Sequence, residues 1–260
     1  MAQSSATARR ALPGRLLSLA LFALALAAWE ALIRLRGLPP LVLPGPALVA
    51  REVVAQVVSG DIWPHLWVTL TEVLLGFLLG SVLGIGLGAT VAHSASIGGV
   101  LRPYVVASQA MPKLAMAPIL VVWFGFDLTP KVVIAALISF FPLFENVLAG
   151  LQAVGQDELE LFRSLQASRW QTFVKLRLPS AVPFVVAGLR VALVLSLVGA
   201  VVAEFVGANK GLGALIVTAQ GTMNTPLMFA IFVVLTVLGI VLSGLADLVE
   251  RLALRWRYGE

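Results

Sequence analysis

The chain has 260 residues, of which 60% are hydrophobic and only 12% charged, and it contains no cysteine. A soluble domain carries about 25% charged residues, so this composition indicates an integral membrane protein. Disulfides and thiolate metal sites are excluded. We attribute the formal net charge of +5 to membrane topology, because basic residues gather at the cytoplasmic ends of spans. The expected partner is therefore the lipid bilayer and not a nucleic acid.

Six apolar stretches are long enough to cross about 30 Å of hydrocarbon, which takes roughly 20 helical residues. They are expected at about 16–33, 66–92, 104–124, 132–151, 181–206 and 227–248. These spans use up the length of the chain. We therefore expect an all-α membrane protein with six transmembrane helices, in which residues 1–260 form one domain.

Basic residues predict the orientation of these spans. With the N-terminus inside, eleven Lys and Arg side chains fall on the cytoplasmic side and five outside, among them Lys131. This bias predicts that both termini lie in the cytoplasm. Arg9, Arg10 and Arg15 precede the first apolar run, so a signal peptide is the alternative there. The run continues to Ile33, as an uncleaved anchor would.

Two segments expected on the outer side are more than turns. Residues 47–58 follow Pro44, Gly45 and Pro46, and residues 212–219 lie between Gly211 and Gly221. Both are predicted to form short helices at the outer surface.

A row of glycines marks the second span. Gly76, Gly80, Gly84 and Gly88 recur every four residues, close to one helical turn, and form a smooth stripe. In lipid, small residues allow helices to approach closely. The stripe predicts a helix–helix contact, either within one bundle or between two subunits.

Polar side chains at membrane depth cost free energy, and we therefore treat them as functional candidates. We expect a translocation pathway or gate at six of them: Gln109, Lys113, Glu145, Asn146, Arg190 and Glu204. There are simpler alternatives. Lys113 and Arg190 are long enough to reach the inner surface, and Glu145 can form a structural ion pair with either of them. Glu204 lies where an outer gate would be.

The sequence excludes several kinds of chemistry. His65 and His93 flank opposite ends of the second span, about 40 Å apart along one helix, so they cannot share a metal ion. The sequence has no histidine pair of the zinc-protease type and no phosphate-binding loop of the Walker A type. Any nucleotide hydrolysis therefore has to occur on another chain.

One polar segment, residues 156–179, separates two apolar spans. We call it the polar loop. Asp157 is expected to cap a helix whose first turn carries Glu158 and Glu160. Leu159, Phe162 and Leu165 recur every three residues and can enter a groove on a partner. A loop that is both charged and apolar is predicted to dock onto something at the membrane surface.

The polar loop resembles the "EAA" cytoplasmic loop of bacterial ABC importer permeases. The resemblance rests on residues 160–168, which read Glu-Leu-Phe-Arg-Ser-Leu-Gln-Ala-Ser, and on the later Leu178-Pro179. Residues 115–119, 123–126, 140–142, 178–183 and 188–190, with Glu204 and Gly211-Leu212-Gly213, look like the nitrate/sulfonate/taurine branch. Together they cover about residues 42–256.

The resemblance implies a type I importer permease with both termini inside, in the bacterial cytoplasmic (inner) membrane. It implies a second permease copy in a homodimer, two ATPase subunits and an extracytoplasmic substrate-binding protein. This chain would bind no cofactor, because ATP and Mg belong to the ATPase, and it would be no enzyme. The residues implied to couple to the ATPase are Asp157, Glu160, Phe162, Arg163, Leu165, Gln166, Ala167, Arg169 and Pro179.

The polar loop departs from the family pattern at two points. Its triplet reads Glu160-Leu161-Phe162 instead of Glu-Ala-Ala, and Gln166 stands where glycine is usual. Glycine permits positive φ at little cost. With glutamine we expect an ordinary αR connection between two short helices.

The substrate is expected to be a small organic anion or a heterocycle. Residues 108–113, Ser-Gln-Ala-Met-Pro-Lys, resemble members that take thiamine precursors or riboflavin. The rival functions are an ATP-independent channel, an intramembrane enzyme, or a membrane protein whose amphipathic loop has no partner. The missing catalytic motifs disfavour the enzyme, and the docking loop disfavours the channel. The flanking family-like motifs disfavour an amphipathic loop without a partner.

Overall fold

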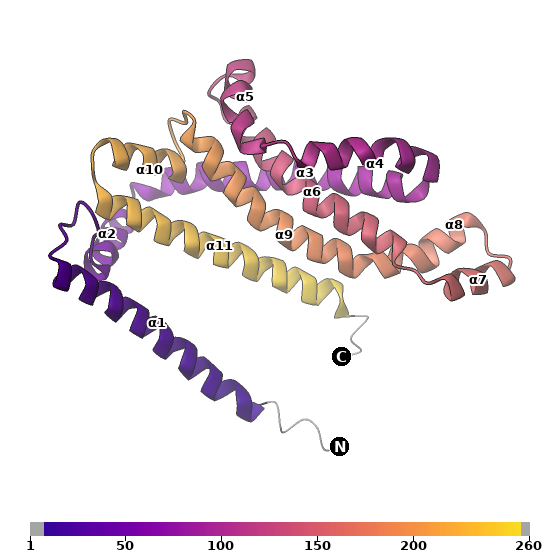
Figure 1. The fold of residues 1–260 in the computed structure, drawn as a ribbon, viewed down its shortest axis with the longest axis horizontal. Helices are drawn as coiled ribbons and strands as arrows, with labels where there is room; N and C mark the ends of the chain where they lie inside the picture. The colour runs from indigo at the N-terminus through magenta and orange to yellow at the C-terminus, as the bar shows by residue number, and fades with distance from the viewer. Residues whose placement is uncertain (1–7, 256–260) are drawn as a thin grey trace. The chain divides into compact units, whose positions relative to one another are not determined.

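The computed structural model describes residues 8–255, and all regular structure in that range is helical (Figure 1). The chain divides into two compact units. The small unit comprises residues up to 60 together with 218–234. The large unit comprises residues 61–217 together with those from 235 onward.

The small unit contains α1 (Ala8–Arg36), α2 (Pro46–Ser59) and the beginning of α11 (Thr225–Ala253). Proline is favoured in the first turn of a helix, and α2 begins at Pro46 and ends at the left-handed Gly60. The Trp29 and Phe229 rings lie 5.8 Å apart, and the Thr225 hydroxyl donates to the Leu41 carbonyl at 2.6 Å. The helix predicted over 47–58 is confirmed as α2.

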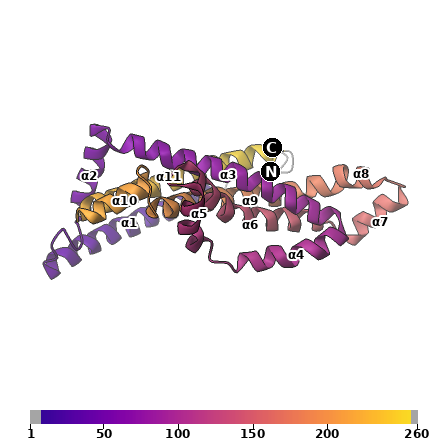
Figure 2. The same ribbon diagram turned by 90° about the horizontal axis from the view of Figure 1, so that it is seen from above.

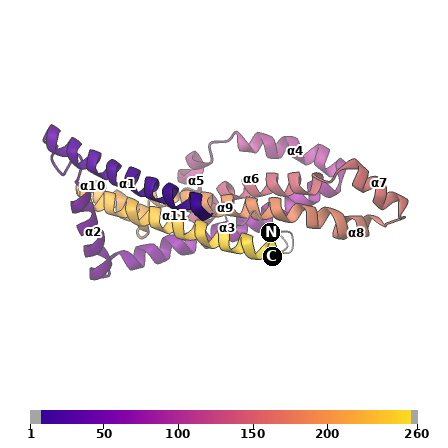
Figure 3. The ribbon, with the colours of Figure 1, turned by 90° about the horizontal axis from the view of Figure 1, so that it is seen from below.

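The large unit is built around three long helices: α3 (Ile62–His93), α6 (Leu128–Gln152) and α9 (Leu178–Phe205). Helix α6 packs against both α3 and α9, and the three run side by side (Figures 2 and 3). Leu143, Val147 and Leu151 of α6 form a core with Ala181 and Ala192 of α9. Together with α1 and α11, these helices are long and apolar enough to cross a membrane.

The predicted third span is not one straight helix. Helix α4 (Ala95–Gln109) is followed by a 3₁₀ turn, η1 (Lys113–Met116), and by α5 (Ala117–Phe124). The two halves are bent by 81°. The break falls at Pro112, because proline disfavours the α conformation for the residue before it and donates no hydrogen bond. Residues 8–255 thus contain five candidate spans, or six if this bent pair is one span.

The glycine stripe lies inside the large unit, against α6. A β-carbon built at Gly80 would meet the Ser139 hydroxyl and the Ala136 carbonyl, and one at Gly84 would lie 3.0 Å from the Phe140 carbonyl. Gly76 faces Ala135 and Gly88 faces Val147 in the same way. Of the two contacts that the stripe allows, the structure shows the one within a single chain.

The polar loop folds into three short pieces. Helix α7 (Gln156–Ser164) is followed by α8 (Arg169–Thr172) and by a π-helical turn, η2 (Phe173–Arg177), which continues into α9. In Figure 1, α7 and α8 lie beyond the end of α6. At the other end of α9 the chain turns into α10 (Leu212–Gly221), which confirms the second short helix predicted outside the spans.

Candidate functional site

Helix α7 begins two residues earlier than predicted, so Asp157 is not its cap. The N-cap residue is Gly155, and Glu158 at the third helical position accepts from the Gly155 N–H at 3.2 Å. Asp157 and Glu158 lie in the first turn, where carboxylates complement the helix dipole. Glu160 belongs to the second turn.

Helix α7 ends in a left-handed turn at Gln166, where φ is +54°. The Ala167 N–H donates to the Phe162 carbonyl at 3.0 Å and the Gln166 N–H to the Arg163 carbonyl at 2.9 Å. This pair of bonds is the Schellman arrangement. The αR connection expected from glutamine is therefore wrong. The two hydrogen bonds hold Gln166 in the conformation that glycine normally supplies.

The second half of the loop is continuous with the membrane helix that follows it. Ser168 and Gln171 cap α8 reciprocally, at 3.2 and 2.8 Å. The π-helical turn directly precedes Leu178 and Pro179, where a proline cannot donate to the preceding turn. The Phe173 ring lies 5.9 Å from Trp170 and 6.0 Å from His93 at the end of α3. The contact with His93 joins the loop to the bundle, and the contact with Trp170 lies within the loop.

Helix α7 has two different faces. At about 100° per residue, Asp157, Glu160, Leu161 and Leu165 share one side, and all are exposed. Leu161 is 57% exposed and Leu165 68%, and Trp170 on α8 is 70% exposed. Leu159 and Phe162, which were expected to enter a partner's groove with Leu165, are half-buried on other sides of the helix. The exposed face combines apolar side chains with carboxylates and suits a partner surface.

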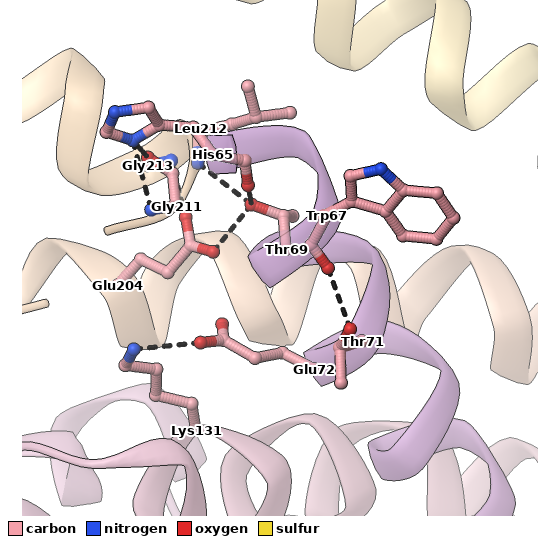
Figure 4. Close-up of polar contacts among 10 residues, drawn as sticks. All are labelled: His65, Trp67, Thr69, Thr71, Glu72, Lys131, Glu204, Gly211, Leu212 and Gly213. Carbon is pink, nitrogen blue, oxygen red and sulfur yellow. Dashed lines mark hydrogen bonds and ion pairs between the residues drawn. The ribbon is translucent and has the colours of Figure 1, made fainter. Parts of the chain in front are cut away.

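A buried polar network lies at the opposite end of the large unit (Figure 4). The Lys131 ammonium contacts the Glu72 carboxylate at 2.8 Å, which ties α6 to α3. Glu72 is 0% and Glu204 1% exposed. A buried ion pair needs close geometry to offset desolvation. Lys131, expected in an outer loop, is instead buried in the first turn of α6.

Glu204 caps the beginning of α10. It accepts from the Gly213 N–H at 2.5 Å and from the Thr69 hydroxyl at 2.6 Å. The Thr69 hydroxyl accepts in turn from the Leu212 N–H at 2.8 Å. The Gly211 N–H donates to His65 Nδ1 at 3.2 Å, and a β-carbon at Gly211 would collide with the Glu204 carboxylate. The network thus satisfies the free N–H groups of a helix start with side chains from α3 and α9.

The six pathway candidates do not form one site. Gln109 donates to Glu145 at 2.9 Å, and the Lys113 ammonium lies 3.8 Å from the centre of the Phe141 ring. These residues of α4, η1 and α6 form one cluster, which we call the mid-bundle cluster. The neighbouring Asn146 amide donates to the Pro142 carbonyl at 2.7 Å.

The remaining candidates lie elsewhere. Arg190 contacts Asp247 at 3.0 Å and Glu250 at 3.7 Å, which links α9 to α11. The structure therefore shows neither of the ion pairs considered for Glu145. Glu204 belongs to the buried network.

Sequence reasoning missed the Glu72–Lys131 pair and the part played by Thr69. The partners are 59 residues apart in the first case, and Thr69 and Glu204 are 135 apart. The only signal available was a carboxylate and a lysine near the beginnings of two predicted spans. That signal did not identify the pairing.

Comparison with known proteins shows the family of this chain. The family described as "Binding-protein-dependent transport system inner membrane component" matches residues 62–255. The riboflavin transport system permease protein RibX of Chloroflexus aurantiacus is 40% identical over 228 residues, 88% of this chain and 85% of its own. The formylaminopyrimidine transport permease protein ThiX of Halalkalibacterium halodurans is 38% identical, over 60% of this chain and 62% of its own.

More distant matches agree with these. A putative aliphatic sulfonates transport permease protein, SsuC of Bacillus subtilis, is 32% identical over 98% of this chain and 94% of its own. An inward-facing structure of the MetNI methionine ABC transporter has a TM-score of 0.63 at 21% identity, covering 72% of this chain and 93% of that chain, and shows the same fold. The protein is therefore a multi-pass inner-membrane permease subunit of a binding-protein-dependent ABC importer, not an enzyme itself, and belongs to that family.

Proposed function

We propose that this permease forms the translocation pathway together with a second copy of itself, and that the polar loop seats on a separate ATPase. The exposed face of α7 carries the second part of the proposal. Leu161 and Leu165 lie beside Asp157 and Glu160 on one side of the helix, and Trp170 is exposed nearby. Apolar side chains exposed next to charges outside the candidate spans are a poor match for lipid or for water. They suit the groove of a protein partner.

In the proposed mechanism the ATPase, not this chain, binds ATP and Mg. Closure of two ATPases would move two such loops and switch the bundle between inward- and outward-facing states. The Schellman turn and the reciprocal cap of α8 keep the loop in one shape, and α8 continues into α9. A displacement of the loop would therefore reach the bundle directly.

An aspartate at position 165 tests the docking face. Leu165→Asp places a charge in the proposed apolar contact and should abolish co-purification with the ATPase. Gln156→Asp is the matched control, because it adds the same charge to the same helix about 180° away. It should bind normally. Equal binding by both variants would refute the docking face. Substrate flux through the permease alone, without ATP, would favour the rival channel function.

For the substrate we propose a small heterocycle, with an organic sulfonate as the second candidate. The relatives at 40% and 38% identity are named for riboflavin and formylaminopyrimidine, and the one at 32% for aliphatic sulfonates. The mid-bundle cluster supports the first choice. It offers an amide, a carboxylate and an ammonium beside an aromatic ring, groups that bind the polar edge and the face of a planar ring.

Uptake by the complete importer, reconstituted with its ATPase and binding protein, tests this choice. Riboflavin, formylaminopyrimidine and taurine would be supplied in parallel with ATP. Uptake of either heterocycle, weakened in Gln109→Leu, supports the proposal. Uptake of taurine alone would overturn it.

A further inference from the structure

A pocket lies behind the polar loop, on the side of α7 away from the proposed docking face. It has a volume of about 470 Å³ and lies between the loop and the last residue of α3. Leu159 and Phe173 supply its apolar wall. His93, Arg163, Arg169 and Arg177 supply its polar wall. We call it the arginine pocket.

The arginine pocket carries strong positive charge without a counter-charge. Its three guanidinium groups come from α7, α8 and η2, and arginine is always charged in proteins. Of the described residues that line it, none is a carboxylate. The ion pairs within the described range also do not involve these arginines. Like charges that line one hollow repel each other, and an anion bound between them offsets this repulsion.

The position of the pocket points to the source of that anion. His93 is the last residue of one candidate span, and Arg177 directly precedes α9, the long apolar helix of the candidate span that runs from Arg169 to Phe205. The pocket therefore lies at the level where the apolar part of the bundle ends. At this level phospholipids carry their phosphate groups, and basic pockets between membrane helices bind anionic head groups.

We propose that the arginine pocket binds the phosphate of an anionic phospholipid. Guanidinium forks match phosphate oxygens with two parallel hydrogen bonds, and the apolar wall accepts the adjoining glycerol and the beginning of an acyl chain. Arg163 and Arg169, expected at the ATPase contact, then bind lipid on one side of the loop. Leu161 and Leu165 on the other side stay free for the partner. The bound lipid would fix the orientation of the docking face.

A titration of the delipidated, detergent-solubilised permease tests this site. Phosphatidylglycerol, phosphatidylcholine and inorganic phosphate would be added separately while the melting temperature is followed. Phosphatidylglycerol should stabilise the protein and phosphatidylcholine should not. In Arg163→Gln/Arg169→Gln the apparent affinity for phosphatidylglycerol should fall about tenfold or more, as expected when charge-assisted hydrogen bonds are lost.

Lys175→Gln is the control for the loop's general positive charge. It removes one positive charge, where the double variant removes two, but Lys175 lines a different pocket together with Glu158, so its response to lipid should equal that of the wild type. Arg163→Lys/Arg169→Lys keeps the charge but loses the guanidinium fork. Its apparent affinity for phosphatidylglycerol should lie between that of the wild type and that of the double glutamine variant. Equal weakening in all variants would overturn the site, since it would indicate unspecific attraction. Inorganic phosphate acting as well as lipid would overturn the lipid source. If Arg163→Gln/Arg169→Gln responds to lipid like the wild type but no longer binds the ATPase, the arginines contact the ATPase and not a lipid.

Discussion

Replacing Gly80 with alanine tests whether the glycine stripe holds α3 against α6. A β-carbon at position 80 would lie 2.7 Å from the Ala136 carbonyl oxygen and would collide with the Ser139 hydroxyl. Carbon–oxygen contacts normally begin at about 3.3 Å, so the helices have to separate by roughly 0.6 Å. Because the carbonyl belongs to the backbone, no side-chain rotation relieves this contact.

The magnitude follows from two opposing terms. Over-packing costs about 1–3 kcal/mol, whereas replacing glycine with alanine inside a helix gains about 1 kcal/mol. Gly86 lies on the same helix with nothing within 4 Å of its added β-carbon. Gly86→Ala should therefore gain helix stability without the over-packing cost. The difference between the two variants isolates the steric cost, about 1–3 kcal/mol in favour of Gly86→Ala.

Thermal unfolding of the two purified variants in one detergent, followed by helical circular dichroism, measures this difference. At about 2–4 °C per kcal/mol, Gly80→Ala should melt roughly 2–12 °C below Gly86→Ala. If Gly80→Ala melts at the same temperature or higher, the two helices are not in close contact at this stripe.

Two further predictions concern single side chains. Lys131→Met leaves the Glu72 carboxylate buried without its cation and should lower the free energy of unfolding by about 3–5 kcal/mol. The exposed Lys210→Met should change it little, and equal melting of the two would contradict the buried pair. Gln166→Gly should stabilise the protein by about 0.5–1 kcal/mol, because relief of left-handed strain exceeds the added entropy of the unfolded chain. An unchanged or lower melting temperature would mean that Gln166 is not strained.

Much of the fold was predictable because lipid imposes simple rules. Continuous apolar length predicted the helices that became α1, α3, α6, α9 and α11, since a span needs a minimum length and excludes charge. The glycine stripe predicted a close helix contact for the same reason. The sequence left open whether that contact lies within one chain, because small residues serve both cases.

The errors have local physical causes. Hydrophobic length placed the third span at about 104–124, whereas its first half begins at Ala95 and the backbone breaks at Pro112. Residue preference alone predicted an αR conformation for Gln166, whereas two hydrogen bonds from the turn outweigh that preference. The Glu72–Lys131 pair depends on how α3 and α6 align, and a single sequence does not contain that alignment.

The continuity of α8, the π-helical turn and α9 has a mechanical consequence. Residues from Arg169 to Phe205 form one continuous helical segment of 37 residues. Trp170 in the loop and Glu204 at the cap of α10 are therefore about 50 Å apart along the same segment. Rotating one end by a few degrees displaces the other by several ångströms. Glu204 joins α9 to α3 through Thr69 and to α10 through Gly213. A force applied at the loop would therefore be transmitted to the far side of the membrane.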